Sequence, residues 1–129
     1  MIRTHISRTM DVSAKDAFAI FIDLDRWPEW GPSVRSATID DGPMRLGSTG
    51  VVTTTVGVRL PYIVTSFVSG KSWAWTVAGV PATDHLVEPL GPGRCRVTFG
   101  VPLVAAPYMA VCAIALRRIE RIALQPSDD

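Results

Sequence analysis

Charged side chains are scarce in this sequence. They make up 19% of its 129 residues, below the share of roughly a quarter that is usual for globular domains. The 13 basic and 12 acidic side chains leave a formal net charge of only +1. A nucleic-acid partner is therefore not expected, because phosphate binding relies on a basic surplus or stripe. Hydrophobic residues reach 47%, and an internal cavity or an oligomer interface would use this apolar excess.

Histidine and cysteine are also rare. The chain has two of each, His5 with His85 and Cys95 with Cys112, and their spacing matches no known metal site. No metal or other cofactor is expected. A disulfide between the two cysteines stays open, although two buried free thiols are favoured. The sequence also lacks a Gly-rich phosphate loop and a nucleophile elbow, which argues against kinase, dehydrogenase and hydrolase functions.

No hydrophobic run is long enough to cross a membrane. The uncharged stretch over residues 101–116 is shorter than the ~20 residues that a spanning helix requires, and Pro102 and Pro107 interrupt it. No basic-then-apolar signal segment precedes the strand-like pattern at the start of the sequence. The expected location is therefore the cytoplasm, with no transmembrane segment.

The first part of the chain predicts a strand and two short helices. Residues 2–11 form the expected strand. Ser13 suits a helix N-cap, with Asp16 three residues later in a capping-box arrangement and apolar residues following at helical spacing. Asp25 is expected to cap a second helical turn, which Gly31 and Pro32 would end.

Strands dominate the middle of the chain, and a helix ends it. Gly and Pro turns at intervals of about ten residues divide residues 33–101 into six strands rich in Val, Thr, Ile and Trp. Because no strand–helix–strand alternation occurs, the sheet should be antiparallel. Residues 107–124 predict a helix of about 27 Å, with Pro107 in its first turn. We expect one domain over residues 1–125 and a loose tail over residues 126–129.

This order of elements is the helix-grip arrangement, and four stretches carry a family likeness. They are residues 12–18, 22–30, 73–76 and 88–98. Together they resemble the START-like, Bet v 1-like (SRPBCC) superfamily and, within it, the bacterial polyketide cyclase/dehydrase-type proteins. The resemblance spans nearly the whole chain. It implies an α+β fold in which a seven-stranded curved antiparallel sheet wraps around the long C-terminal helix. It also implies an apolar cavity between sheet and helix that takes lipids, steroids, polyketides or hydrophobic hormones, and a smaller one here because the chain is compact.

Alternation along the strands predicts which side chains face the helix. The predicted inward face leaves Arg94, Arg96 and Glu88 on the face of the sheet that points away from the helix. Tyr62 follows Pro61, so a bulge is expected there and its facing stays open. Trp27 and Trp30 could gate a ligand or plug the open end of the sheet, and the plug is favoured. The predicted ligand-binding residues are Trp27, Trp30, Tyr62, Trp73, Trp75, Thr83, His85, Val87, Val97, Phe99, Tyr108, Met109, Cys112 and Leu116.

His85 is the candidate for acid–base chemistry, because the ordinary pKa of histidine lies near neutrality. Cyclisation of a poly-β-ketone needs enolate formation and loss of water, which a positioned base would assist. However, no second titratable group is placed beside His85 by spacing, and a hydrogen-bonded wall residue is the commoner role. Arg59 could hold an anionic ligand group, although a solvated arginine is favoured. Cys112 lacks a basic neighbour and suits inert packing.

Three functions follow from these patterns. The leading hypothesis is binding of a small hydrophobic molecule, lipid-like or polyketide-like, in the internal cavity. The alternatives are a polyketide cyclase/dehydratase-type enzyme that uses His85, and a non-catalytic module that binds a protein partner. The half-helix over residues 108–116 is apolar on all sides, so its outward side should meet something, and a homodimer contact is preferred. The arginines that follow it, Arg117, Arg118 and Arg121, are expected to be solvated, with a membrane-surface or acidic-partner role as the less favoured alternative.

Overall fold

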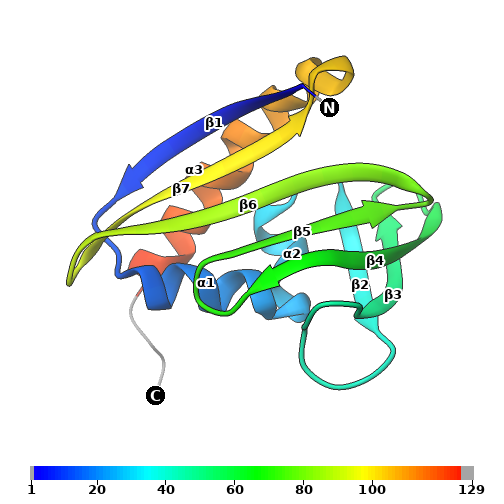
Figure 1. Ribbon diagram of the computed structural model, residues 1–129, viewed down its shortest axis with the longest axis horizontal. Helices are drawn as coiled ribbons and strands as arrows, with labels where there is room; N and C mark the ends of the chain where they lie inside the picture. Colours follow the sequence, from blue (N-terminus) through cyan, green and yellow to red (C-terminus); the bar gives the residue numbers. More distant parts are fainter. Residues whose placement is uncertain (1, 126–129) are drawn as a thin grey trace.

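A seven-stranded antiparallel sheet curves around a C-terminal helix in the computed structural model, which describes residues 2–125 (Figure 1). The strand order is β1-β7-β6-β5-β4-β3-β2. The predicted helix-grip fold is confirmed, whereas the predicted tail, residues 126–129, lies outside the described residues. The elements are β1 (Arg3–Met10), α1 (Ala14–Ile22), the 3-10 turn η1 (Leu24–Arg26), α2 (Trp27–Trp30), β2 (Val34–Ile39), β3 (Thr49–Thr54), β4 (Arg59–Val68), β5 (Ser72–Val77), β6 (Val80–Gly91), β7 (Arg94–Pro102), the 3-10 segment η2 (Leu103–Tyr108) and α3 (Met109–Leu124).

The inward face of the sheet is the one that strand alternation predicts. Trp73, His85 and Phe99 are buried in register across three neighbouring strands, because Trp73 pairs with His85 and His85 with Phe99. Arg94 and Arg96 lie exposed on the other face of β7. The side-chain period of two residues therefore fixes one apolar wall toward the helices.

The bulge that we expected at Tyr62 lies further along β4. The register with β3 is regular at Pro61, and the irregularity with β5 falls between Val64 and Ser66. Pro61 keeps its place in the ladder through its carbonyl oxygen, which accepts from the Ala78 N–H at 2.8 Å. The missing N–H of proline therefore interrupts no pairing here. Tyr62 itself is buried and faces inward.

Of the two predicted helix caps after β1, one is confirmed and one is wrong. The Ser13 hydroxyl accepts from the Asp16 N–H at 3.1 Å, so the predicted N-cap of α1 is confirmed. The prediction that Asp25 caps the second helix is wrong, because Asp25 lies inside the 3-10 turn and neither η1 nor α2 has a side-chain cap. A side-chain hydrogen bond ties this turn to α1 instead, because the Trp27 Nε1–H donates to the Phe21 carbonyl oxygen at 2.8 Å.

The C-terminal α-helix begins later than the sequence suggests. Residues 103–108 form a 3-10 segment that contains Pro107, and the α-helix starts at Met109. Proline lacks the N–H of a helical hydrogen bond and disfavours α geometry in the residue before it, so the chain enters α3 through the tighter turn. Arg117 and Arg121 on α3 are exposed as expected, whereas Arg118 is half-buried. Across residues 2–125, no helix has the length and apolar character needed to cross a membrane.

Candidate functional site

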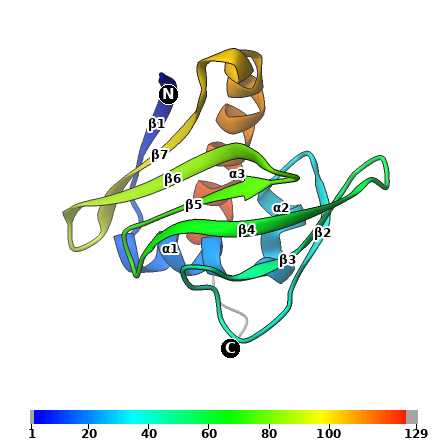
Figure 2. The ribbon, with the colours of Figure 1, turned by 45° about the vertical axis from the view of Figure 1, so that its right-hand side comes forward.

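A cavity of about 340 Å³ opens at the end of the sheet where β2, β4 and β6 begin and β3, β5 and β7 end. Figure 2 shows this end with η2 above it. The volume lies near the lower limit of small-molecule sites, which span about 300–1,000 Å³. The cavity is lined by Ser33, Val34, Val52, Thr54, Leu60, Trp75, Val77, Pro81, Ala82, Thr83, Val101, Pro102, Ala105 and Tyr108.

The lining of this cavity carries no charged side chain. Its polar side-chain groups are the hydroxyls of Ser33, Thr54, Thr83 and Tyr108, together with the indole of Trp75. The remaining wall is aliphatic or proline. Such a wall disfavours a formal charge on a ligand, because a buried ion without a partner loses its hydration with no compensation.

Thr83 stands at the centre of a short hydrogen-bond chain. Its Oγ1 accepts from Trp75 Nε1 at 3.0 Å and lies 3.0 Å from His85 Nε2. The other ring nitrogen of His85, Nδ1, lies 3.1 Å from the Trp73 carbonyl oxygen. A carbonyl oxygen can only accept, so we assign the proton to Nδ1, and the Thr83 O–H then donates to Nε2. One lone pair of the Thr83 oxygen remains available to a donor in the cavity.

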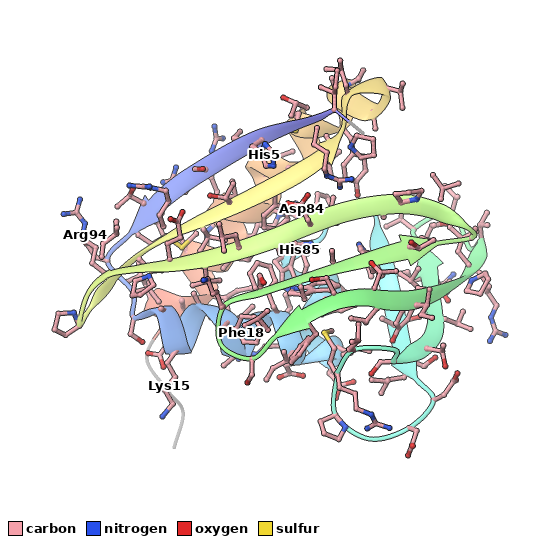
Figure 3. The ribbon with its side chains drawn as sticks, viewed as in Figure 1. His5, Lys15, Phe18, Asp84, His85 and Arg94 are labelled. Carbon is pink, nitrogen blue, oxygen red and sulfur yellow. The ribbon has the colours of Figure 1, made fainter. Side chains whose placement is uncertain are left out.

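His85 is held as a neutral imidazole. Its ring stacks on Trp73 at a centroid distance of 3.9 Å and contacts the ring of Phe99. Burial lowers the pKa of His85 to about 3, the hydrogen bond to the Trp73 carbonyl acts against this shift, and the positive charge of Arg3 adds to it. Arg3 itself pairs with Asp84 at 2.6 Å. Figure 3 labels Asp84 beside His85 on β6. With both nitrogens engaged, His85 can orient Thr83, but it is a poor base for a ligand.

Tyr108 and Ser33 form one side of the cavity mouth. Their hydroxyl oxygens lie 2.7 Å apart, which joins the start of α3 to the segment before β2. Burial raises the pKa of Tyr108, while the hydrogen bond with Ser33 acts in the opposite direction. One hydroxyl hydrogen of the pair is left over, so the pair can donate one hydrogen bond to a ligand at the mouth.

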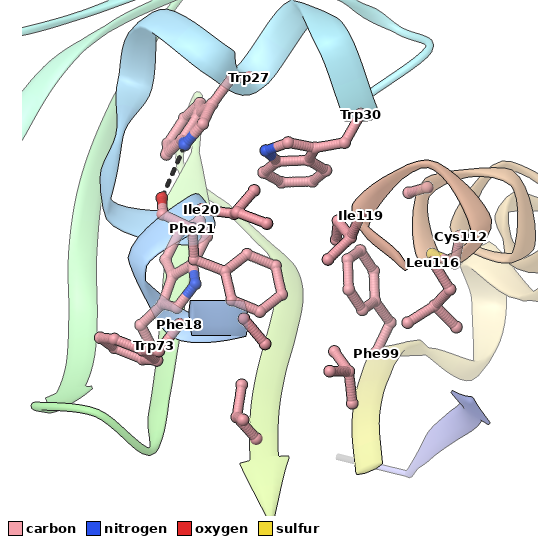
Figure 4. Close-up of a cluster of buried hydrophobic side chains, with 14 of the residues drawn as sticks. Phe18, Ile20, Phe21, Trp27, Trp30, Trp73, Phe99, Cys112, Leu116 and Ile119 are labelled. Carbon is pink, nitrogen blue, oxygen red and sulfur yellow. Dashed lines mark hydrogen bonds between the residues drawn. The ribbon is translucent and has the colours of Figure 1, made fainter. Parts of the chain in front are cut away.

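Aromatic side chains fill the deeper half of the space under the sheet (Figure 4). Phe21 of α1 contacts the rings of Trp30, Trp73 and Phe99 at centroid distances of 5.5, 6.1 and 5.7 Å. Trp27 of α2 stacks on Trp73 at 5.5 Å. A small cavity of about 40 Å³ lies in this region, next to the main cavity. The helices after β1 thus plug the interior and leave the ligand-sized space at the mouth.

The small inner cavity has an unusual donor in its wall. Trp30 is 6% exposed, lines this space, and its Nε1–H has no hydrogen-bond partner among residues 2–125. The inner and main cavities share five lining residues, among them Trp75 and Thr83. An acceptor oxygen, from water or from a ligand, would satisfy this indole, because a volume of about 10–15 Å³ already suffices for one water molecule.

The predicted site residues fall into three groups. The first group consists of the three that line the main cavity, Trp75, Thr83 and Tyr108. Trp27, Trp30, His85, Phe99 and Cys112 line the inner cavity, as do Trp75, Thr83 and Tyr108 again. The residues that line neither cavity are Tyr62, Trp73, Val87, Val97, Met109 and Leu116.

The helix α3 therefore contributes less to the main cavity than the sequence led us to expect. That cavity is bordered by η2, whose last residue is Tyr108, whereas Leu116 and Ile119 of α3 are buried in the core. The sequence pattern did not predict the lining residues at strand ends, such as Val52, Leu60 and Val101. Their inward facing follows from alternation, but their meeting at one mouth follows only from the curvature of the sheet.

The two cysteines are buried free thiols. Burial raises the pKa of Cys112 to about 11, with a smaller contribution from Asp84, and burial also raises the pKa of Cys95. Neither thiol is activated as a nucleophile. Within residues 2–125, no three side chains of His, Cys, Asp or Glu gather as a ligand set for a metal ion.

Comparison with known proteins identifies the family. Residues 1–124 match the family described as "Polyketide cyclase / dehydrase and lipid transport" (Polyketide_cyc2). The chain belongs to this family. Family and fold together place it in the START-like, Bet v 1-like (SRPBCC) superfamily of hydrophobic ligand-binding proteins. Among curated proteins, none matches the sequence significantly.

Solved structures of other proteins share the fold at low sequence identity. The protein XoxI from Bacillus cereus superposes with a TM-score of 0.76 at 12% identity, over 97% of both chains. A START superfamily protein from Mycobacterium smegmatis gives 0.72 at 14% identity, over 93% of this chain and 98% of that one. Norcoclaurine synthase from Thalictrum flavum, a point mutant in complex with a transition-state analogue, gives 0.68 at 14% identity, over 95% and 94%. At these identities the likeness shows the fold alone.

Proposed function

We propose that this protein binds a small, neutral, hydrophobic molecule in the cavity at the mouth of the sheet, with a polar group of the ligand directed at Thr83. The observation that carries the proposal is the cavity itself, which has a volume of about 340 Å³ and no charged side chain in its wall. A ligand of this size replaces roughly eleven waters, at about 30 Å³ for each water. This is room for a compact ring system rather than for a lipid with two long chains.

Burial of apolar ligand surface is the main source of binding free energy, and no reaction of the ligand is required. Burial of about 300 Å² of apolar ligand surface contributes about 7 kcal/mol before the cost of association is subtracted. Before that cost is subtracted, about 7 kcal/mol corresponds to a Kd of about 10 μM, so hydrogen bonds to the ligand must offset most of the cost of association for submillimolar binding. Polar groups then decide which apolar molecules fit. Thr83 offers an acceptor lone pair, because its own hydrogen is donated to His85, and the Ser33–Tyr108 pair offers one donor. A hydroxyl-bearing ligand matches both.

A binding role suits the residues better than the cyclase/dehydratase alternative. An acid–base mechanism would need a group that titrates near neutral pH within reach of the ligand. The pKa of His85 is lowered to about 3, and His85 lies behind Thr83 in the inner cavity rather than in the lining of the main one. Its contribution is to fix the direction of the Thr83 hydroxyl.

Three matched probes test the proposal by isothermal titration calorimetry. We expect 2-naphthol to bind with submillimolar affinity, and naphthalene to bind more weakly because it lacks the hydroxyl. We expect 2-naphthoate to bind more weakly than 2-naphthol, because a carboxylate directed at Thr83 has no charged partner in the wall. Equal binding of 2-naphthol and 2-naphthoate would contradict a neutral site. Binding of none of the three would contradict the proposal as a whole.

A cavity-filling variant locates the binding. Leu60 lines the cavity from β4, so Leu60→Trp should fill part of it and abolish 2-naphthol binding. Val68→Trp is the control, because Val68 lies on the same strand and is 51% exposed away from the lining. Both changes place a tryptophan on a strand, where aromatic residues are well tolerated. Loss of binding in both variants, or in neither, would place the ligand elsewhere.

A further inference from the structure

Exposed apolar side chains gather around the cavity mouth. Fourteen large apolar side chains are exposed among residues 2–125, and half of them lie at this end of the molecule. The most exposed are Val104 at 95% and Val56 at 84%. We call this set the mouth-end surface, and it consists of Ile2, Val56, Val58, Val80, Leu103, Val104 and Tyr108.

The topology explains why these residues meet. Val56 and Val58 belong to the turn between β3 and β4, and Val80 begins β6 at the turn after β5. Leu103 and Val104 start η2 directly after β7, and the Leu103 N–H donates to the Ile2 carbonyl at 3.0 Å. In an antiparallel sheet with this strand order, all these turns fall at one end. Figure 1 shows η2 at the top of the molecule and the β3–β4 and β5–β6 turns at its right-hand edge.

Apart from the Arg3–Asp84 ion pair, the charges at this end have one sign. The segments that build it, residues 31–37, 49–60, 77–83 and 100–111, contain no Asp or Glu. Arg35 and Arg59 are exposed there. The Arg35 guanidinium lies beside the β3–β4 turn, 4.0 Å from the position that a Cβ on Gly57 would take. Arg3 is ion-paired with the nearby Asp84, so that pair adds no net charge.

We propose that the mouth-end surface docks onto the surface of an anionic lipid bilayer. Apolar tips of this kind enter the boundary between headgroups and acyl chains, and arginines beside them are attracted to anionic headgroups. Each arginine near such a surface contributes about 1 kcal/mol, which corresponds to about fivefold in affinity. Docking would place the cavity mouth against the bilayer, so that a neutral apolar ligand enters without crossing water. This inference goes beyond the proposed ligand binding and is tested separately.

A second copy of the chain is a poorer occupant of the same surface. In a twofold symmetric dimer each copy presents the same patch. Arg35 and Arg59 would then face the same two arginines of the other copy, with no acidic residue in these segments to pair with them. An anionic bilayer matches both the apolar tips and the positive charge.

Vesicle flotation with the whole protein tests the proposal. We expect binding to vesicles of phosphatidylcholine with 30% phosphatidylglycerol, roughly tenfold weaker binding at 0.5 M salt, and little binding to phosphatidylcholine alone. Val104→Asp should lower the affinity for the anionic vesicles more than tenfold, because burying a valine contributes about 1.5–3 kcal/mol and the new carboxylate is repelled. Val104 is almost fully exposed, so this change leaves folding intact.

The matched control is Leu46→Asp. Leu46 is 64% exposed in the loop between β2 and β3, at the opposite end of the sheet, and its replacement should leave vesicle binding unchanged. Absence of binding to anionic vesicles, or equal losses in the two variants, would overturn the proposal. A concentration-dependent dimer in sedimentation experiments that Val104→Asp abolishes would also overturn it, in favour of a second copy. The Leu60→Trp protein should retain vesicle binding, which separates failure of docking from failure of ligand binding.

Discussion

The buried imidazole of His85 makes the stability of this protein depend on pH in a defined window. In the folded chain the pKa of His85 is lowered to about 3, mainly because the ring is enclosed and loses hydration. In the unfolded chain it returns to its ordinary value near 6.5. Between these values the unfolded state binds a proton that the folded state does not. The free energy of unfolding therefore falls as the pH falls below about 6.5, and the loss ends near pH 3.

The magnitude follows from proton linkage. Each pH unit within the window changes the free energy of unfolding by about 1.36 kcal/mol for one proton. Acidification from pH 7 to pH 5 should therefore remove about 2 kcal/mol through His85 alone. That amount is large against the 5–15 kcal/mol of a typical domain. Urea denaturation at pH 7, 6 and 5 measures it as a falling transition midpoint at an unchanged slope.

The variant His85→Gln separates this contribution from other titrating groups. Glutamine does not titrate, so the variant should lose about 2 kcal/mol less than the wild type over the same pH range, even if it is less stable throughout. His5→Gln is the control, because His5 lies exposed on β1. This variant should lose as much free energy of unfolding between pH 7 and pH 5 as the wild type. If wild type and His85→Gln show the same dependence on pH, the assignment of a neutral, enclosed imidazole is wrong.

Two further predictions concern Thr83 and the thiols. Thr83→Val removes the hydroxyl that joins Trp75 to His85, so it should destabilise the fold by about 1–3 kcal/mol through the unpaired buried nitrogen, as measured by urea denaturation. It should also weaken binding of 2-naphthol by up to about tenfold while leaving naphthalene binding nearly unchanged, and equal losses for both ligands would argue against a hydrogen bond at this position. Because Cys95 and Cys112 are buried with raised pKa values, neither should react with Ellman's reagent at pH 8 until urea unfolds the protein. Rapid reaction of one thiol in the native protein would show that this thiol is accessible.

Some features of the fold were predictable because they depend on local pattern. The Ser13 cap and the inward facing of Trp73, His85 and Phe99 follow from spacing along one segment. The start of α3 was misplaced because Pro107 fits the first turn of an α-helix and a 3-10 turn equally well. Local pattern does not distinguish the two.

The cavity was predictable only in kind. Its apolar character follows from composition, and Trp75 and Thr83 follow from alternation. Its position depends on how completely Phe21 and Trp27 fill the space under the sheet, which is a matter of packing between distant segments. Leu60 and Val101 become neighbours of one cavity only after the sheet curves. The homodimer contact through the apolar half of α3 stays a prediction, with Ile114 at 40% exposed on its outer side.

The central claim is that a neutral ligand occupies the cavity at the mouth rather than the aromatic interior. Nuclear magnetic resonance of the ¹⁵N-labelled protein tests it most directly, because the indole N–H signals of Trp75 and Trp73 report on the two regions and can be assigned with Trp75→Phe and Trp73→Phe. Trp75 lines the main cavity, whereas Trp73 is 1% exposed and lines neither cavity. Titration with 2-naphthol should shift the Trp75 signal strongly and leave that of Trp73 almost unchanged. A larger shift at Trp73, or no shift at Trp75 under saturating ligand, would contradict the account.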